Sequence, residues 1–261
     1  MGKFITIGER IHCISPAIRA AMESKDPEPI LKRAKEQLDA GAVYLDVNIG
    51  PAEKTGEDLM KWAVTLLQEH FDNVPLCLDT ANKKAIAAGI SVYNRAKGKP
   101  IVNSADAGDR ISYLALAAEN DAICISLCSK SGVPADNDER MAYCQEMLEY
   151  GTERGMEPED LWFDPLCLVI KGMQDKQAEM LEFVRQLSDM GFNSVCGLSN
   201  VSNGMPKTVR PIMDSVMLAM AMQCGLTSAI VNPCDLRIME TVKSADIILN
   251  KTLYADSYLE L

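Results

Sequence analysis

The stretch DPEPILKRAKEQLDAGAVYLDVN, residues 26–48, joins an amphipathic helix to an apolar strand and decides the fold. Asp26 is a typical helix N-cap, and Pro27 fits the first turn, where the backbone N–H has no helical partner. One face of the helix carries the apolar residues Ile30, Leu31, Ala34 and Leu38. Gly41 ends the helix, and the apolar run Ala42–Val47 has the length of a strand. This order of helix, glycine and strand is the repeating unit of α/β proteins.

The same alternation continues along the rest of the chain. Apolar runs of strand length are Phe4–Ile7, Ala42–Val47, Pro75–Leu78, Ile101–Val102, Ala122–Leu127, Leu161–Phe163, Ser194–Cys196 and Ala229–Val231. Further helical stripes lie around Leu59–Leu67, Ala85–Tyr93, Ile111–Ala118, Met141–Tyr150, Met180–Leu187, Val209–Cys224 and Leu236–Leu249. About eight such units, with no Pro/Gly/Ser linker between them, predict a single (β/α)8 TIM barrel over residues 1–261. An open doubly wound sheet is the alternative, but no GxGxxG follows the first strand to support its dinucleotide-binding form.

The composition argues against several classes of partner. At 261 residues, with 48% hydrophobic and 24% charged residues, the chain can bury a core without a disulfide or metal staple. The net charge of −11 and the lack of a Lys/Arg cluster argue against nucleic acid. No apolar run approaches the ~20 residues of a membrane span, and no signal peptide is recognisable. We therefore expect a cytoplasmic enzyme that binds neither nucleic acid nor membrane.

Cysteine and histidine usage argues against disulfide and metal chemistry. The nine cysteines form no CxxC pair, and several lie within apolar runs, as Cys77 does between Leu76 and Leu78. Such thiols usually act as small hydrophobic side chains in a reducing compartment. The two histidines, His12 and His70, form no HxH or HExxH motif, so we expect no directly bound metal ion.

Polar residues follow the apolar runs of the predicted strands. They are Glu9 and Arg10, Asp46 and Asn48, Asp79 and Asn82, Asn103 and Ser104, Ser126, Asp164, Ser199 and Asn200, and Asn232. In a parallel barrel these positions converge on the C-terminal rim of the strands, where active sites of this fold lie. Asn, Asp and Ser also cap helices, and that simpler role suits Ser126 and some of the others.

Capping does not explain Asp79 and Asp164 well, because each directly follows an apolar strand. A buried carboxylate is unfavourable without a partner, and few cations lie near either residue in the sequence. A ligand with paired N–H donors would supply that partner. The N3–H and 2-amino group of a pterin form such a fork, and Asn103 offers both a donor and an acceptor to the same ring. The sequence therefore predicts a pterin site at the rim.

Six short motifs occur in order along nearly the whole chain. They are Ile7-Gly8-Glu9-Arg10-Ile11, Asp46-Val47-Asn48-Ile49-Gly50-Pro51, Cys77-Leu78-Asp79-Thr80-Ala81-Asn82, Val102-Asn103-Ser104, Phe163-Asp164-Pro165-Leu166 and Gly197-Leu198-Ser199-Asn200-Val201-Ser202. Together they resemble methyltetrahydrofolate:corrinoid protein methyltransferases, as do Arg210-Pro211 and Leu218–Met222. That family shares the pterin-binding barrel of dihydropteroate synthase and of the folate module of cobalamin-dependent methionine synthase. The resemblance implies methyl transfer between N5 of tetrahydrofolate and the cobalt of a corrinoid protein.

The resemblance also implies a role for each matched residue. Asp164 would bind the pterin N3–H and 2-amino group, while Asp79 and Asn103 hold the rest of the ring. Asn200 would hydrogen-bond N5 or its proton in the transition state and thus be the catalytic residue. The other implied positions are Gly197, Ser199 and Arg210 as substrate-binding residues, and Glu9, His12, Asp46 and Asn48 as rim contacts.

Reactants and partners follow from the same resemblance. Tetrahydrofolate or 5-methyltetrahydrofolate would be the substrate, and the corrinoid (cobalamin) would arrive on a separate protein, since the carrier signature DxHxxG is absent from this sequence. Folds of this type are usually homodimers. The direction of transfer stays open, because relatives either take methyl from folate for acetyl-CoA synthesis or deliver it to tetrahydrofolate during demethylation.

The sequence departs from the family pattern at a few positions, which leaves the corrinoid partner open. His12 stands where Asn is common, Ala81 stands where Thr or Ser is usual, and Asn232–Asp235 differs from relatives. Two other functions are weighed. A dihydropteroate synthase-like enzyme is disfavoured because its Lys-x-x-Arg-x-His ending is missing. A non-catalytic folate-binding subunit is disfavoured because Asn200 is kept.

Overall fold

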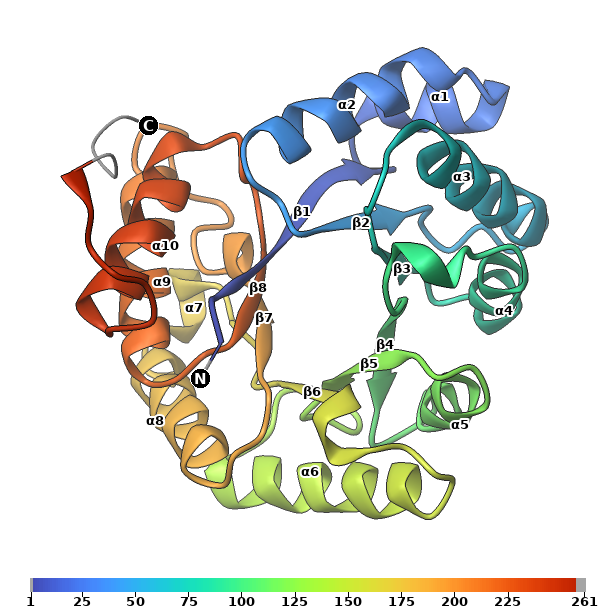
Figure 1. Ribbon diagram of the computed structural model, residues 1–261. Helices are drawn as coiled ribbons and strands as arrows, with labels where there is room; N and C mark the ends of the chain where they lie inside the picture. The colour runs from blue at the N-terminus through green and yellow to red at the C-terminus, as the bar shows by residue number, and fades with distance from the viewer. Residues whose placement is uncertain (1, 257–261) are drawn as a thin grey trace.

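The strands of the molecule form one closed barrel. The computed structural model describes residues 2–256. Its strands are β1 (Ile5–His12), β2 (Tyr44–Asn48), β3 (Leu76–Asp79), β4 (Ile101–Asp106), β5 (Ile123–Leu127), β6 (Leu161–Asp164), β7 (Val195–Gly197) and β8 (Ser228–Val231). They pair in parallel in the order β6-β5-β4-β3-β2-β1-β8-β7, and a bridge between Phe163 and Ser194 closes the ring. The predicted (β/α)8 barrel is confirmed, with the helices around the outside (Figure 1).

The helices follow the strands in the expected alternation. They are α1 (Pro16–Ser24), α2 (Pro27–Asp39), α3 (Gly56–His70), α4 (Lys83–Ser91), α5 (Ser112–Glu119), α6 (Asn137–Thr152), α7 (Ile170–Met173), α8 (Lys176–Asp189), α9 (Arg210–Gln223) and α10 (Leu236–Ile248), with 3-10 turns η1 (Arg95–Lys97), η2 (Pro158–Asp160) and η3 (Leu198–Asn200). Asp26 caps α2 as predicted, accepting a hydrogen bond from Glu28 N at 3.1 Å. No helix within residues 2–256 is long and apolar enough to cross a membrane.

Two helices, α1 and α7, were not predicted from the sequence. Helix α1 buries only Ile18, Ala21 and Met22, which is too short a stripe to show a clear period. Helix α7 has four residues and is interrupted by non-helical backbone at Lys171 and Gly172. Both are additions to the strand–helix alternation and leave its order unchanged.

Side chains on each strand alternate between the barrel interior and the helix layer. The interior is filled by the apolar cluster of Ile7, Cys77, Ile101, Ile123, Ile125, Trp162 and Val195, with Ile5, Tyr44 and Ile230 packed against it. Two residues further along these strands, the period of two places Glu9, Asp46, Asp79, Asn103 and Asp164 above this cluster. The polar end of the interior is therefore the C-terminal rim.

The first and fourth strands extend further than the apolar runs indicated. Glu9 and Arg10 were expected after the first strand, but both lie within β1. Its register against β2 shifts between Gly8 and Ile11, and Gln37 Oε1 of α2 accepts a hydrogen bond from Arg10 N at 2.8 Å there. A Cβ on Gly8 would lie 2.6 Å from the same Oε1 atom, so glycine is needed.

The fourth strand is also longer than its apolar run predicted. Asn103 and Ser104 were expected to close it, but β4 continues to Asp106. Its pairing with β5 shifts register between Asn103 and Ala105, so the strand continues past the point where its apolar run stops. Strand length depends here on pairing across the barrel, which an apolar run does not report.

Candidate active site

Four side chains from neighbouring strands β2, β3 and β4 form one polar surface at the rim. The strand register places Asn48 beside Asp79, and Asp79 beside Asn103. Asn48 Nδ2 donates a hydrogen bond to Asp79 Oδ2. Asn103 Nδ2 donates to Asp46 Oδ1 at 3.2 Å. All four face the barrel interior, because alternate residues of a strand share a face.

Burial favours the neutral forms of the two carboxyls on this surface. It raises the pKa of Asp79 to about 6, against the opposing effects of the Asn48 hydrogen bond and the charge of Arg110. It raises the pKa of Asp46 well above its usual range, and the charge of Asp79 adds to the effect. Two neighbouring carboxyls in a dry site lose their protons in succession. The pair therefore keeps a proton to higher pH than isolated carboxyls do, and in that state it can both donate and accept hydrogen bonds.

Asp164 ends β6 and presents a carboxyl with little protein support. Its Oδ1 accepts one hydrogen bond, from Leu166 N at 2.8 Å. The residue is 8% exposed, and burial raises the pKa of its carboxyl to about 7. Within residues 2–256 it forms no ion pair with a basic side chain. A ligand with N–H donors would satisfy the remaining oxygen positions.

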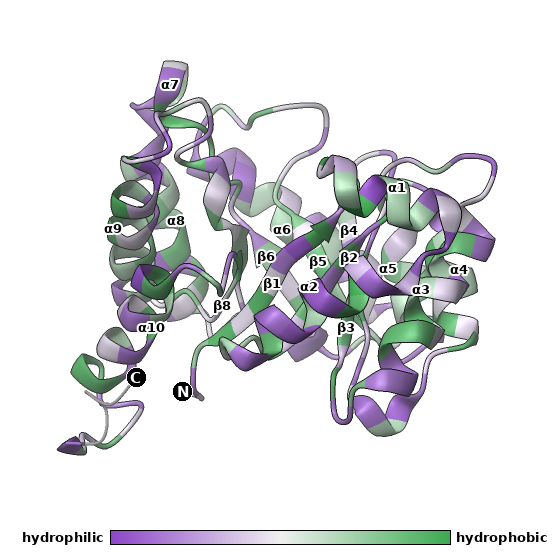
Figure 2. Cartoon of the chain, turned by 90° about the horizontal axis from the view of Figure 1, so that it is seen from above, coloured by the Kyte–Doolittle hydropathy of each residue, from purple (hydrophilic) through white to green (hydrophobic). Residues whose placement is uncertain are grey.

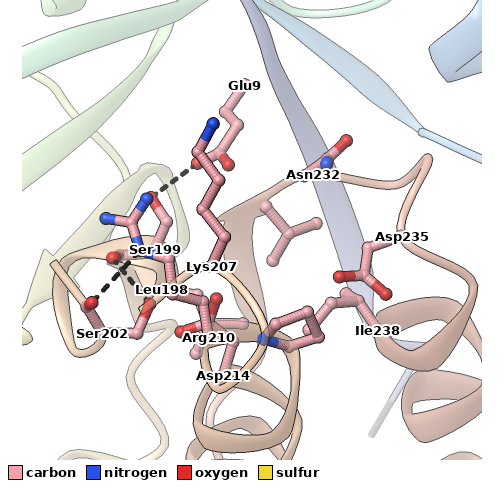
Figure 3. A pocket seen from close by; sticks show the side chains of 12 residues that line it. Glu9, Leu198, Ser199, Ser202, Lys207, Arg210, Asp214, Asn232, Asp235 and Ile238 are labelled. Atoms are coloured by element: carbon pink, nitrogen blue, oxygen red, sulfur yellow. Dashed lines mark hydrogen bonds between the residues drawn. The ribbon is translucent and has the colours of Figure 1, made fainter. Parts of the chain in front are cut away.

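A cavity of about 270 Å³ opens beside Glu9, at the ends of β1, β7 and β8 (Figure 3). Its lining residues are Glu9, Leu198, Ser199, Ser202, Lys207, Arg210, Pro211, Asp214, Val231, Asn232, Asp235 and Ile238. Ser199 Oγ donates to Glu9 Oε2 at 2.9 Å, and burial raises the pKa of Glu9 to about 7. Arg210 donates to Ser202 O at 3.2 Å and to Asn203 Oδ1 at 3.1 Å, which fixes its guanidinium on the wall.

Asn200 lies on the short turn η3 that follows β7. The residue is exposed. A Cβ on Gly197 would be 3.1 Å from Asn200 Nδ2, so the amide lies close to Gly197 and would shift slightly if a larger residue stood there. Gly197 pairs with Ile230 of β8, whose side chain packs against the interior cluster. Asn200 therefore follows the C-terminal end of β7 directly, with its side chain exposed.

His12 ends β1 beside Asn48, its register partner in β2. Its Nδ1 atom is buried and has no hydrogen-bond partner in the described residues. Burial lowers the pKa of the ring, because the charged imidazolium loses hydration. A neutral imidazole with one unpaired nitrogen is thus available at the rim.

The predicted residues fall into groups that converge on the rim. Asp46, Asn48, Asp79 and Asn103 share one surface. Glu9, Ser199 and Arg210 share the cavity. The charge of Glu9 also contributes to the raised pKa of Asp46, which links the two groups. Asp164 and Asn200 form no hydrogen bond to either group within residues 2–256, and two other polar residues serve structure: Asn82 caps α4 and Ser126 bonds within its own strand.

Some residues near the site were not found from the sequence. Cys77 hydrogen-bonds Asp46, and Arg110 affects the pKa of Asp79 while pairing with Asp106 at 2.8 Å. Strand alternation applied to Cys77 and Asp79 would have placed the thiol in the interior below the carboxyl. No sequence signal ties Arg110 to the site, because it follows a strand end that the apolar run missed. No group of three or more His, Cys, Asp or Glu within residues 2–256 is arranged to hold a metal ion.

Comparison with known proteins finds relatives that align with most of this chain. A methylcorrinoid:tetrahydrofolate methyltransferase of Eubacterium limosum is 27% identical over 265 residues, covering 97% of this chain and 94% of the relative. A methionine synthase of Mycobacterium tuberculosis is 26% identical over 244 residues, but this chain spans only 20% of its length.

Solved structures of dihydropteroate synthases share the fold. The enzyme of Xanthomonas albilineans with 4-aminobenzoic acid superposes with a TM-score of 0.73 at 16% identity, covering 97% of this chain and 95% of that one. The enzyme of Vibrio fischeri gives 0.72 at 14% identity, covering 96% and 94%. The family described as pterin binding enzyme matches residues 16–232, and the chain therefore belongs to the pterin-binding enzymes.

Proposed function

We propose that this chain is a methyltransferase that moves a methyl group between N5 of tetrahydrofolate and the cobalt of a corrinoid (cobalamin) carried by a partner protein. The observation that carries the proposal is the set of interior rim carboxyls Asp46, Asp79 and Asp164, whose pKa values burial raises and which share the rim with amide side chains. The name of the Eubacterium limosum relative, which aligns over 94% of its length, supports this reaction.

The rim offers complementary partners to each edge of a pterin. The carboxyl of Asp164 would accept from the pterin N3–H and 2-amino group, since among the described residues only Leu166 N bonds it. Asp79 and Asn103 would hold the rest of the ring, because their surface contains both donors and acceptors. Asp46, Asn48, Glu9 and His12 would complete the rim around it.

Asn200 would act on the reacting atom. N5 of methyltetrahydrofolate leaves poorly unless it is protonated or strongly hydrogen-bonded. A neutral amide whose hydrogen bond strengthens as charge develops on N5 lowers the barrier by a few kcal/mol. The bound corrinoid supplies the cobalt that accepts or gives the methyl group. The exposed position of Asn200 on the turn after β7 suits a residue that works between two large reactants.

The cavity beside Glu9 would take the part of folate that extends beyond the ring. The p-aminobenzoyl-glutamate tail carries carboxylates, and Lys207 and Arg210 are the cations of the cavity lining. Ser199 lines the same cavity, and its Oγ donates to Glu9 Oε2 at 2.9 Å. Ser199 lies in the turn η3, which also bears Asn200. Gly197 leaves the space in which the Asn200 amide lies.

The proposal includes the partners and the setting of the enzyme. A corrinoid protein is the partner, and the functional unit is a homodimer of one-barrel chains in the cytoplasm. An apolar stripe on α9 supports the dimer: Val209 is 39%, Ile212 49%, Val216 51% and Met220 50% exposed. Their spacing of three or four residues puts them on one side of the helix. Figure 2 shows hydrophobic residues along α9 at the edge of the molecule. We call Val209, Ile212, Val216 and Met220 the α9 stripe.

Substitution of Asn200 tests the reaction and separates it from a non-catalytic folate subunit. We expect Asn200→Ala to slow methyl transfer from 5-methyltetrahydrofolate to free cob(I)alamin by on the order of 10²-fold, with tetrahydrofolate binding retained. Asn120→Ala, at the end of α5 away from the rim, is the matched control. Wild-type rates in Asn200→Ala would show that Asn200 takes no part in the reaction, and the non-catalytic folate-binding function would then be favoured.

The dihydropteroate synthase reaction is the remaining rival for the same site. The dihydropteroate synthases whose structures superpose on this chain share 14% to 16% identity with it, so the likeness shows the fold and does not assign the reaction. A coupled assay with dihydropterin pyrophosphate and p-aminobenzoate distinguishes the two, and turnover in that assay would overturn the methyltransferase proposal.

A further inference from the structure

Arg140 is a charged side chain buried inside the helix layer. Its side chain is fully buried, at 0% exposure. Nη1 pairs with Glu179 of α8 and donates to Asn137 Oδ1 at 2.8 Å. Nη2 is buried and has no hydrogen-bond partner within residues 2–256. A buried guanidinium that is only partly satisfied lowers stability relative to an apolar side chain of similar volume, so packing alone does not account for it.

The remaining donor of Arg140 reaches the rim. Nε donates to the carbonyl oxygen of Pro165 at 3.2 Å, 25 residues away in the chain. Pro165 directly follows Asp164, and Leu166 N donates back to the Asp164 carboxyl at 2.8 Å. The main-chain oxygen of Asp164 also accepts from Cys128 N at 2.9 Å. Arg140 is thus the side chain that fixes the middle residue of the turn carrying the Asp164 carboxyl.

Leu166 gives an independent sign that this turn is held by its surroundings. Its φ is +66°, in the left-handed region that a leucine rarely adopts. Such backbone persists only where neighbouring groups hold it. The Pro165 carbonyl bonded to Arg140 lies directly before this residue, so Arg140 and the Asp164 carboxyl hold the turn from its two sides.

We propose that Arg140 is a positioning residue for folate binding, which orients the Asp164 carboxyl through its hydrogen bond to Pro165 O. This inference rests on the proposed function, in which Asp164 binds the pterin. Arg140 acts through backbone geometry, because its hydrogen bond goes to the Pro165 carbonyl, which directly precedes the Leu166 N–H that bonds the Asp164 carboxyl. Glu179 and Asn137 anchor the guanidinium to α8 and to the start of α6, so the turn is tied to two rigid helices.

Tetrahydrofolate titrations of the whole chain test the inference. Arg140→Lys keeps a cation for Glu179 but loses the planar fork that reaches Pro165 as well. We expect it to weaken tetrahydrofolate binding by on the order of tenfold, while the methyl-transfer rate at saturating folate changes by less than about twofold. Glu182→Gln is the matched control: it removes an exposed charge pair with Arg185 on the same helix α8 but leaves Arg140 and its Pro165 contact intact, and it should leave the dissociation constant unchanged.

A double-substitution cycle separates positioning from general structural loss. Asp164→Asn should weaken tetrahydrofolate binding, and adding Arg140→Lys to it should have no further effect. Unchanged binding in Arg140→Lys, or losses that add in the double variant, would refute the positioning role alone. Unchanged binding in Asp164→Asn would instead remove Asp164 from the proposed pterin site. If Arg140→Lys does not fold, Arg140→Met with Glu179→Gln replaces it, because this pair of substitutions leaves no unpaired charge in the buried site; Lys176, the other partner of Glu179, is partly exposed and keeps its hydrogen bond to Ala135 O.

Discussion

At the residue scale, the rim combines carboxyls whose neutral forms are favoured with side chains that lack partners. Within residues 2–256 the Asp164 carboxyl receives one hydrogen bond, and His12 Nδ1 has no hydrogen-bond partner. A ligand that satisfies such atoms on binding avoids leaving them buried and unpaired, which is costly in a dry site. Specificity at this rim therefore depends on which unpaired atom each ligand group reaches.

His12 provides a test of that idea, because its two ring nitrogens can be imitated separately. The amide of Asn lies near the position of Nδ1, and that of Gln lies near Nε2. If Nδ1 contacts the ligand, His12→Asn should keep tetrahydrofolate affinity, whereas His12→Gln and His12→Leu should weaken it about fivefold, equivalent to ~1 kcal/mol for one hydrogen bond. Equal affinities of all the variants in a calorimetric titration would show that His12 does not contact folate.

At the element scale, the turns after the strands carry the chemistry, while the helices hold those turns in place. Gln37 of α2 supplies the hydrogen bond that lets β1 continue past its bulge. Arg140 of α6 fixes the Asp164 turn. Helix α9 begins with Arg210 on the cavity wall and carries the α9 stripe on its outer side. The same helix thus joins the site to the proposed dimer face.

A charge placed in the α9 stripe tests the dimer. Val216 is 51% exposed in its middle. We expect wild-type protein to sediment as a dimer and Val216→Glu as a monomer, because the carboxylate would be buried against the partner's apolar stripe. Val92→Glu, at a position 41% exposed after α4, is the control and should remain dimeric. A dimer that survives Val216→Glu would place the interface elsewhere.

At the scale of the whole molecule, the polar rim makes the free protein sensitive to pH. The pKa of Glu9 is raised from 4.5 to about 7, that of Asp79 from 3.8 to about 6, and that of Asp164 from 3.8 to about 7. At a pH between the ordinary and the raised pKa of a group, the folded protein holds more protons at that group than the unfolded chain does. The stabilising contribution is complete below the ordinary pKa of each group and is lost as pH rises through the folded-state pKa.

The free protein is therefore expected to lose stability as pH rises from about 4.5 to about 7. Each group contributes at most roughly 1.4 kcal/mol per pH unit within its window. Urea unfolding at about pH 5 and about pH 7.5 measures the change. Asp164→Asn should reduce it, because the amide does not titrate, whereas Asp189→Asn at an exposed site on α8 should not. An identical pH dependence in Asp164→Asn and wild type would contradict the neutral state of Asp164.

The fold class and the polar positions at the strand ends could be predicted from the order of the residues alone. Alternating apolar runs and amphipathic stripes, such as the unit at residues 26–48, are local signals, so eight repeats of them predict the barrel. Once the fold is known, a polar residue at the end of a strand must lie at the rim. Asp79 and Asp164 could therefore be predicted to lie at the same rim although they are far apart in the chain, and their binding of one ligand stays a prediction.

The contacts that support the site and the shifts in the pKa values of its groups became visible only in the folded molecule. Ser199 bonds Glu9 across 190 residues, and Arg140 bonds Pro165 across 25. The raised pKa values come from burial by side chains of several strands. None of these has a local pattern, because hydrogen bonds and desolvation depend on distance in space, while periodicity records only neighbours along the chain.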